Sequence, residues 1–154
     1  MSIDARLLEL GIEIPGEVEP AGNYIGCNTS GNLAFTAGQV PIENGERTGI
    51  GKLGREYTIE DGYKYARMCG LMVLCRLKNA LGGNLDRVVK VVKLTGFVNS
   101  TDDFIDQPKV LNGASDLMIE IFGEAGRHSR SAVGVNTLPM GICVEVEGIF
   151  EIRD

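Results

Sequence analysis

Hydrophobic and polar residues alternate between residues 130 and 147, and this alternation predicts two strands joined by a turn that contains Pro139 and Gly141. Successive side chains point to opposite faces of a strand. We expect four residues to share the core face: Val133, Val135, Val144 and Val146. The opposite face of this hairpin would then carry one arginine, two small residues and two glutamates: Arg130, Ala132, Gly134, Glu145 and Glu147.

This polar face predicts a binding site for a small acid. The planar guanidinium of Arg130 can donate two parallel hydrogen bonds to a carboxylate, worth about 1.5–3 kcal/mol once water is excluded. Glu145, expected across the hairpin, could act as a base toward a water molecule. A second interpretation remains open, in which Arg130 is a surface residue that forms a salt bridge with Glu145 or Glu147.

The rest of the chain shows both helical and strand periodicity. For the first part of the chain we predict a helix over 2–10 ended by Gly11, an extended linker over 12–22, strands over 23–29 and 32–37, and a glycine-rich loop over 43–55. The second part should contain a helix over 58–81 that begins with a capping box at Thr58, a strand over 87–98, and a helix that is capped by residues 100–103, is bent or restarted by Pro108 and ends near 122.

This order is ββαβαββ, and two helices on one face of a sheet predict an α+β sandwich. We expect a single domain over residues 1–154, with residues 1–22 as an N-terminal helix and linker extension. One face of such a sheet would remain uncovered, and association of subunits can cover it.

Composition restricts the classes of partner. The net charge of −6 disfavours binding to nucleic acid or to an anionic membrane. No apolar run approaches the roughly 20 residues of a membrane span, and residues 1–10 carry charges where a signal peptide would be apolar. The four cysteines show no C-x-x-C spacing, which predicts free thiols in a cytoplasmic protein and no metal site.

Two motifs resemble the RidA family, also called YjgF or the reactive intermediate deaminase family. The first is R-S-x-V-x-V-x-x-L-P followed by V-E-V-E, and the second is N-Y-I-G-C-N-T-S-G-N-L-A-F-T-A-G-Q-V-P. The resemblance covers roughly residues 20 to 152. The N-terminal extension and the run N-G-A-S-D-L-M-I-E-I-F-G-E-A-G-R-H-S-R are similar to a longer subgroup of the family.

The resemblance implies a chorismate-mutase-like fold assembled as a homotrimer, with no cofactor. It implies that Arg130 holds the substrate carboxylate and that Glu145 orients the attacking water. Four further positions match residues that line the family's site: Tyr24, Gly38, Asn112 and Ala132. The implied reaction is hydrolysis of enamines or imines, such as 2-iminobutanoate and 2-iminopropanoate, to 2-oxo acids and ammonia.

The chain departs from the family pattern at two positions. Ala37 replaces the serine that precedes Gly-Gln, and Ala132 replaces a cysteine two residues after the arginine. The missing serine hydroxyl favours an alternative in which the same cleft binds a small carboxylate without turnover. Ribonuclease activity, a third hypothesis, conflicts with the acidic charge and with the absence of a basic patch. The only histidine, His128, is interpreted as a solvated loop residue.

Overall fold

A computed structural model describes residues 1–154. The regular elements are α1 (Ile3–Leu10), β1 (Cys27–Ser30), β2 (Leu33–Thr36), β3 (Ile42–Glu43), β4 (Glu46–Arg47), α2 (Ile59–Ala80), β5 (Val88–Asn99), α3 (Gln107–Phe122), β6 (Ser129–Val135) and β7 (Val144–Ile152), with short 3-10 turns at Leu85–Arg87, Gly123–Gly126 and Pro139–Gly141. None of the three α-helices combines the length and the apolar character needed to span a bilayer.

The predicted caps mark the end of α1 and the start of α2, whereas the third helix begins later than predicted. Thr58 and Asp61 form the predicted capping box of α2, and Gly11 ends α1 in the left-handed conformation. The third helix begins at Gln107, so the prediction that residues 100–103 cap it is wrong. Pro108 lies in its first turn, where its missing N–H costs nothing, so of the two predicted alternatives the restart at Pro108 is confirmed and the bend is wrong.

The five-stranded sheet has the order β1-β2-β7-β5-β6. The predicted hairpin between residues 130 and 147 is wrong, because β5 lies between its two strands. β6 runs parallel to β5 and forms one edge of the sheet, whereas β7 runs antiparallel to β5. The small β3–β4 hairpin occupies part of the segment predicted as a loop, and β1 begins at Cys27 instead of residue 23.

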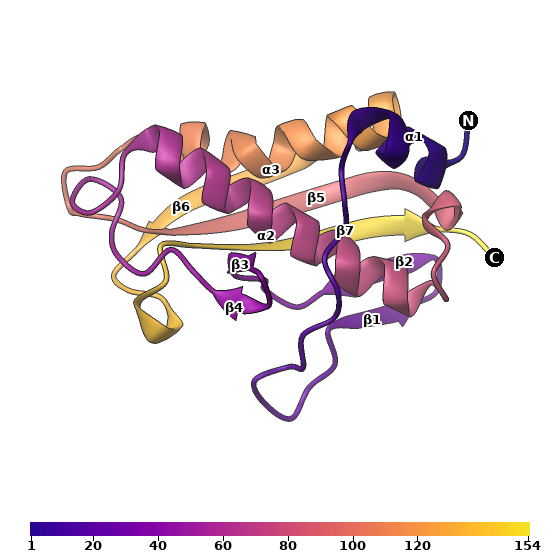
Figure 1. The fold of residues 1–154 in the computed structure, drawn as a ribbon, viewed down its shortest axis with the longest axis horizontal. Helices are drawn as coiled ribbons and strands as arrows, with labels where there is room; N and C mark the ends of the chain where they lie inside the picture. Colours follow the sequence, from indigo (N-terminus) through magenta and orange to yellow (C-terminus); the bar gives the residue numbers. More distant parts are fainter.

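Both long helices, α2 and α3, cover the same face of this mixed sheet, as predicted (Figure 1). Their inner side chains and the inward residues of the sheet form one cluster of 24 buried residues, which includes Val144, Val146 and Phe150 of β7. The opposite face carries Phe35 and Val133, which are 39% and 44% exposed. The chain thus leaves one face of its sheet uncovered.

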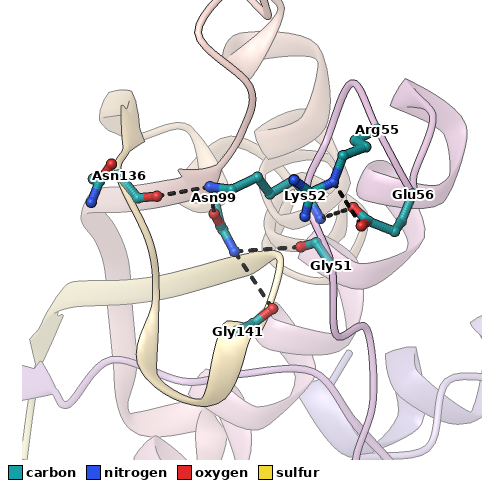
Figure 2. A network of polar contacts seen from close by, with 7 residues as sticks. All are labelled: Gly51, Lys52, Arg55, Glu56, Asn99, Asn136 and Gly141. Carbon is teal, nitrogen blue, oxygen red and sulfur yellow. Dashed lines mark hydrogen bonds and ion pairs between the residues drawn. The ribbon is translucent and has the colours of Figure 1, made fainter.

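A polar network holds the connection from β6 to β7 across the end of β5 (Figure 2). The amide of the buried Asn99 donates to the carbonyl oxygens of Ile142 at 3.1 Å and of Gly141 at 3.5 Å. Lys52 donates to Asn99 Oδ1 at 2.6 Å and to the carbonyl oxygen of Asn136 at 2.7 Å. The crossover is therefore fixed at both its beginning and its end.

Close contact between α2 and α3 depends on Gly113. A Cβ atom there would overlap the carbonyl oxygen of Tyr63 and approach the backbone nitrogen of Arg67 to 3.0 Å. We expect Gly113→Ala to lower the free energy of unfolding by about 1–3 kcal/mol, although alanine favours a helix by itself. Urea unfolding measures this change. Gly16→Ala, with open space around it, should be nearly neutral, and equal effects of the two variants would contradict the close contact.

Candidate active site

The candidate site residues fall into two groups in the folded chain. Arg130 and Asn112 lie together beside α3, on the helix-covered side of β6. Gly38, Tyr24 and Glu145 line a separate cavity, to which β7, the central strand, contributes Glu145. The predicted common face of Arg130 and Glu145 is therefore wrong.

Strand register explains the separation. Phe97 of β5 pairs with Glu145 on one side and with Val133 on the other, so these three side chains share the open face. Leu94, three residues earlier, pairs with Arg130, which therefore points to the helix-covered face. Two strand spacings and a three-residue offset put the Arg130 and Glu145 backbones about 10 Å apart in each direction.

Arg130 is held by neutral groups. Its Nη1 atom donates to Asn112 Oδ1 at 2.8 Å and to Ser115 Oγ at 3.1 Å. None of the seven ion pairs of the chain includes Arg130, so the alternative of a salt bridge with Glu145 or Glu147 is wrong. Partial burial lowers the pKa of Arg130, and the nearby Asp116 carboxylate offsets this effect in part.

This arrangement leaves one side of the guanidinium available. An arginine has five N–H donors, and two of them, both on Nη1, are used by Asn112 and Ser115. The donors on Nε and Nη2 remain and form an edge that matches the two oxygens of a carboxylate. Arg130 also lines a surface recess of about 310 Å³ beside α3.

Neighbouring side chains lie close to both small residues of β6. A Cβ atom at Gly134 would come within 2.9 Å of Gln107 Nε2 and 3.1 Å of Ser100 Oγ. The side chain of Ala132 packs against the hydrophobic core. Any contact between Ala132 and a ligand would therefore have to use its backbone.

Glu145 lies beside Gly38 at a cavity of about 200 Å³. A Cβ atom at Gly38 would come within 2.8 Å of the Glu145 carboxyl carbon, so only glycine leaves this carboxylate its position. No protein group donates a hydrogen bond to Glu145. Burial, and secondarily the negative charge of Glu147, raises the pKa of Glu145 above its ordinary value. The carboxylate is thus poorly solvated and unpaired.

The walls of this cavity include residues that the strand pattern did not indicate. The N-terminal extension contributes Val18 and Pro20, and the crossover contributes Pro139 and Met140. Tyr24 also lines the cavity, from a turn that precedes β1, and is 52% exposed. Ala37 directly precedes Gly38 and donates its backbone N–H to the carbonyl oxygen of Gly26, and its methyl side chain supplies no hydroxyl group.

Arg76 is the most informative wall residue that sequence reasoning missed. Only 7% exposed, it donates from Nε to Gln39 Oε1 at 3.2 Å and forms a 3.3 Å ion pair with Glu17 of the N-terminal extension. The sequence spacing could have indicated the burial of Arg76, because Arg76 follows Val73 by three residues and so lies on the buried side of α2. The extension is thereby attached to the helix beside the cavity.

His128 and Ser115 were also missed. His128 is half-buried, and its ring nitrogens lie 2.7 Å from the carbonyl oxygen of Gly126 and 2.9 Å from Ser115 Oγ. The interpretation of His128 as a solvated loop residue is therefore wrong. Ser115 follows Leu111 by four residues and precedes Met118 by three, a spacing that places it on the inner side of α3.

Cysteine chemistry has no support in this fold. All four cysteines are free, as predicted. Burial raises the pKa of Cys143 to about 12 and the pKa of Cys69 well above its ordinary value, which keeps both as thiols. No three side chains among His, Cys, Asp and Glu are arranged to hold a metal ion.

Comparisons with known proteins agree with this fold. The family described as "YjgF/chorismate mutase-like, putative endoribonuclease" matches residues 4–149. Protein TCP17 of Trypanosoma cruzi is 44% identical over 153 residues, which cover 99% of this chain and 95% of that protein.

Two solved structures are similar along almost the whole chain. Atu1372 of Agrobacterium tumefaciens, described as a protein of unknown function, is 40% identical with a TM-score of 0.90 and covers 98% of this chain and 92% of its own. A structure from Shewanella oneidensis, described as a "putative endoribonuclease", is 36% identical with a TM-score of 0.94 and covers 99% and 100%. With the family match over residues 4–149, these likenesses show that the chain belongs to the YjgF/RidA family and has its chorismate-mutase-like fold.

Proposed function

We propose that the protein hydrolyses small 2-imino acids, or the corresponding enamines, to 2-oxo acids and ammonia at a site shared between two copies of the chain. The observation that supports this most is the state of Arg130, whose guanidinium is fixed by neutral partners and has an unused edge. The unpaired, poorly solvated Glu145 supplies the complementary base. One chain alone cannot bring these two groups together.

A homotrimer is the assembly that we propose to join them. β6, which carries Arg130, is an edge strand with one side unpaired, and such edges favour contact with another chain. The open face beside Glu145 carries Phe35, Phe97 and Val133, whose apolar surface is stabilised when a neighbour covers it. In a cyclic assembly the Arg130 edge of one copy meets the Glu145 cavity of the next.

The proposed hydrolysis uses the positive charge of Arg130 and the negative charge of Glu145. The Nε and Nη2 donors of Arg130 bind the substrate carboxylate and direct the imine carbon toward the cavity. Glu145 accepts a proton from a water molecule while the water oxygen bonds to the imine carbon. Glu145 then passes this proton to the imine nitrogen. The hydroxyl proton of the resulting carbinolamine then moves to the nitrogen as the C–N bond breaks, which releases ammonia and the 2-oxo acid. Because the pKa of Glu145 is raised, its carboxylate is a stronger base than an ordinary glutamate.

Ala37 favours a second candidate function. A methyl group replaces a hydroxyl next to Gly38, so one polar contact to a bound molecule is lost. The same site would then bind a 2-oxo acid or another small carboxylate without turnover and serve as a sensor. The ribonuclease activity named for some relatives is the weakest candidate, because the chain carries a net charge of −6.

Substitution of Arg130 tests the carboxylate contact. We expect Arg130→Ala to reduce kcat/KM for 2-iminobutanoate by about 10- to 100-fold or more, since a charge-assisted pair of hydrogen bonds is lost. Ammonia release measures turnover, and calorimetry with 2-oxobutanoate measures binding. Arg55→Ala removes an exposed arginine of a surface ion pair and should change neither. Binding without turnover in the wild-type protein would favour the sensor, and full activity of Arg130→Ala would refute the proposed mechanism.

Mixed assemblies test whether the site is shared. Arg130→Ala and Glu145→Gln should each be inactive alone. After the two variants are unfolded together and refolded, about a quarter of the interfaces should pair an intact Arg130 with an intact Glu145 from a neighbouring copy. Recovered turnover therefore indicates a shared site. If Arg130 and Glu145 acted within one chain, no intact site would form and the mixture would stay inactive.

The pH dependence of stability tests the burial of Glu145. The pKa of Glu145 is raised in the folded chain, so protonation of Glu145 stabilises the folded state at low pH. This stabilisation is lost as the pH rises through the raised pKa. Glu145→Gln should therefore be more stable than the wild type at neutral pH, with a difference that closes near pH 4. Urea unfolding across this range measures the effect. Glu151→Gln controls for the loss of one charge, and a pH-independent difference for Glu145→Gln would contradict its burial.

A further inference from the structure

We propose that His128 and Ser115 form a positioning pair that orients the Arg130 guanidinium for a carboxylate and makes the affinity for that carboxylate respond to the charge of His128. The role of the pair depends on the carboxylate-binding function proposed above for Arg130. Neither residue touches the reacting atoms, so both act through Arg130.

The donor and acceptor roles in the pair of His128 and Ser115 can be assigned in only one way. The carbonyl oxygen of Gly126 can only accept, so the hydrogen of the neutral His128 ring lies on Nδ1, 2.7 Å away. Nε2 then carries a lone pair and accepts from the hydroxyl of Ser115 at 2.9 Å. With its hydrogen directed to His128, Ser115 Oγ presents a lone pair to Arg130 Nη1 at 3.1 Å.

This chain of contacts determines which edge of Arg130 stays free. Asn112 and Ser115 are one turn apart on α3 and together take both hydrogens of Nη1. The plane of the guanidinium is therefore fixed, and its Nε and Nη2 hydrogens point away from α3. If the Ser115 hydroxyl were absent, one Nη1 hydrogen and the His128 lone pair would both lose their partner.

Burial makes the pair sensitive to these losses. Ser115 is 8% exposed and His128 is half-buried, so water replaces a missing partner poorly. A hydrogen bond in such a setting contributes about 0.5–1.5 kcal/mol. Converted at 1.4 kcal/mol for each tenfold, loss of one contact corresponds to about a 3- to 10-fold loss of carboxylate affinity.

Charges around His128 set the sign of the pH effect. Burial lowers the pKa of His128, the hydrogen bond to the Gly126 carbonyl oxygen offsets this in part, and the positive charge of Arg130 lowers the pKa again. The other ionisable groups at this recess are Arg127, which pairs with Glu124, and Asp116, which accepts a hydrogen bond from Tyr63. A carboxylate bound to Arg130 adds a negative charge beside His128 and should raise its pKa. By reciprocity, the acid should bind more tightly as pH falls through the titration of His128.

The single histidine allows a direct test. A ¹⁵N NMR spectrum of the full chain contains one imidazole, and its nitrogen shifts report which nitrogen carries the hydrogen. We expect the Nδ1–H form near neutral pH, and a higher pKa of His128 after 2-oxobutanoate is added. The Nε2–H form, or a pKa that is unchanged when the acid binds, would overturn the positioning pair.

Variants of the pair complete the test. Ser115→Ala and His128→Gln should each weaken 2-oxobutanoate binding by about 3- to 10-fold, raise KM in the same proportion and leave kcat nearly unchanged, since only orientation is affected. Ser115→Thr keeps the hydroxyl and should bind as the wild type does. His128→Gln should also remove the pH dependence of binding. Circular dichroism and urea unfolding of each variant separate these effects from loss of folding.

Two outcomes distinguish this pair from the proposed reaction. If the wild type binds 2-oxobutanoate in a Ser115-dependent way but hydrolyses no imine, the reaction is refuted and the pair stands. If Arg130→Ala abolishes turnover but Ser115→Ala binds and reacts as the wild type does, the pair is refuted and the reaction stands. A wild-type protein that binds no 2-oxobutanoate between pH 5 and 8 would overturn both.

Discussion

The insertion of β5 between β6 and β7 is the constraint on which the candidate site depends. β5 pairs with β6 in parallel and with β7 antiparallel, and each pairing decides which face every side chain occupies. Arg130 is thereby sent to the helix-covered face and Glu145 to the open one. A shift of either strand by one residue would exchange the faces, so the core residues of the sheet fix the positions of both charges.

Much of the architecture could be predicted from local patterns. The Thr58 capping box and the Gly11 cap define helix ends through contacts between near neighbours in the chain, and such signals are readable from sequence. The order of elements and the coverage of one sheet face followed from the same periodicity. The effect of Pro108 was harder to predict, because a proline is compatible both with a bend inside a helix and with the first turn of a helix.

The pairing of strands could not be read in this way. Alternation between residues 130 and 147 is compatible with a hairpin and with two strands separated by a third, since both give a period of two. The distinction is made by contacts distant in sequence, above all by Asn99 and Lys52, which hold the crossover over the end of β5. The family resemblance indicated the relevant residues, whereas their separation into two groups required the register of β5.

Arg130 and Glu145 are two partly buried ionisable side chains without an ionic partner. Arg130 is oriented by amide and hydroxyl oxygens, which fix its geometry without cancelling its charge. Glu145 is left without donors, and Gly38 approaches it closely enough to limit its motion. A salt bridge would have stabilised either group but would also have consumed its capacity to meet an outside partner.

The ion pair between Arg76 and Glu17 attaches the N-terminal extension to α2 beside the cavity. Val18 and Pro20 of this extension line the cavity beside Glu145, and neither residue belongs to a helix or strand or to the main core cluster. Substitutions in this segment can alter the size and shape of what fits while the sheet and its two charges stay as they are.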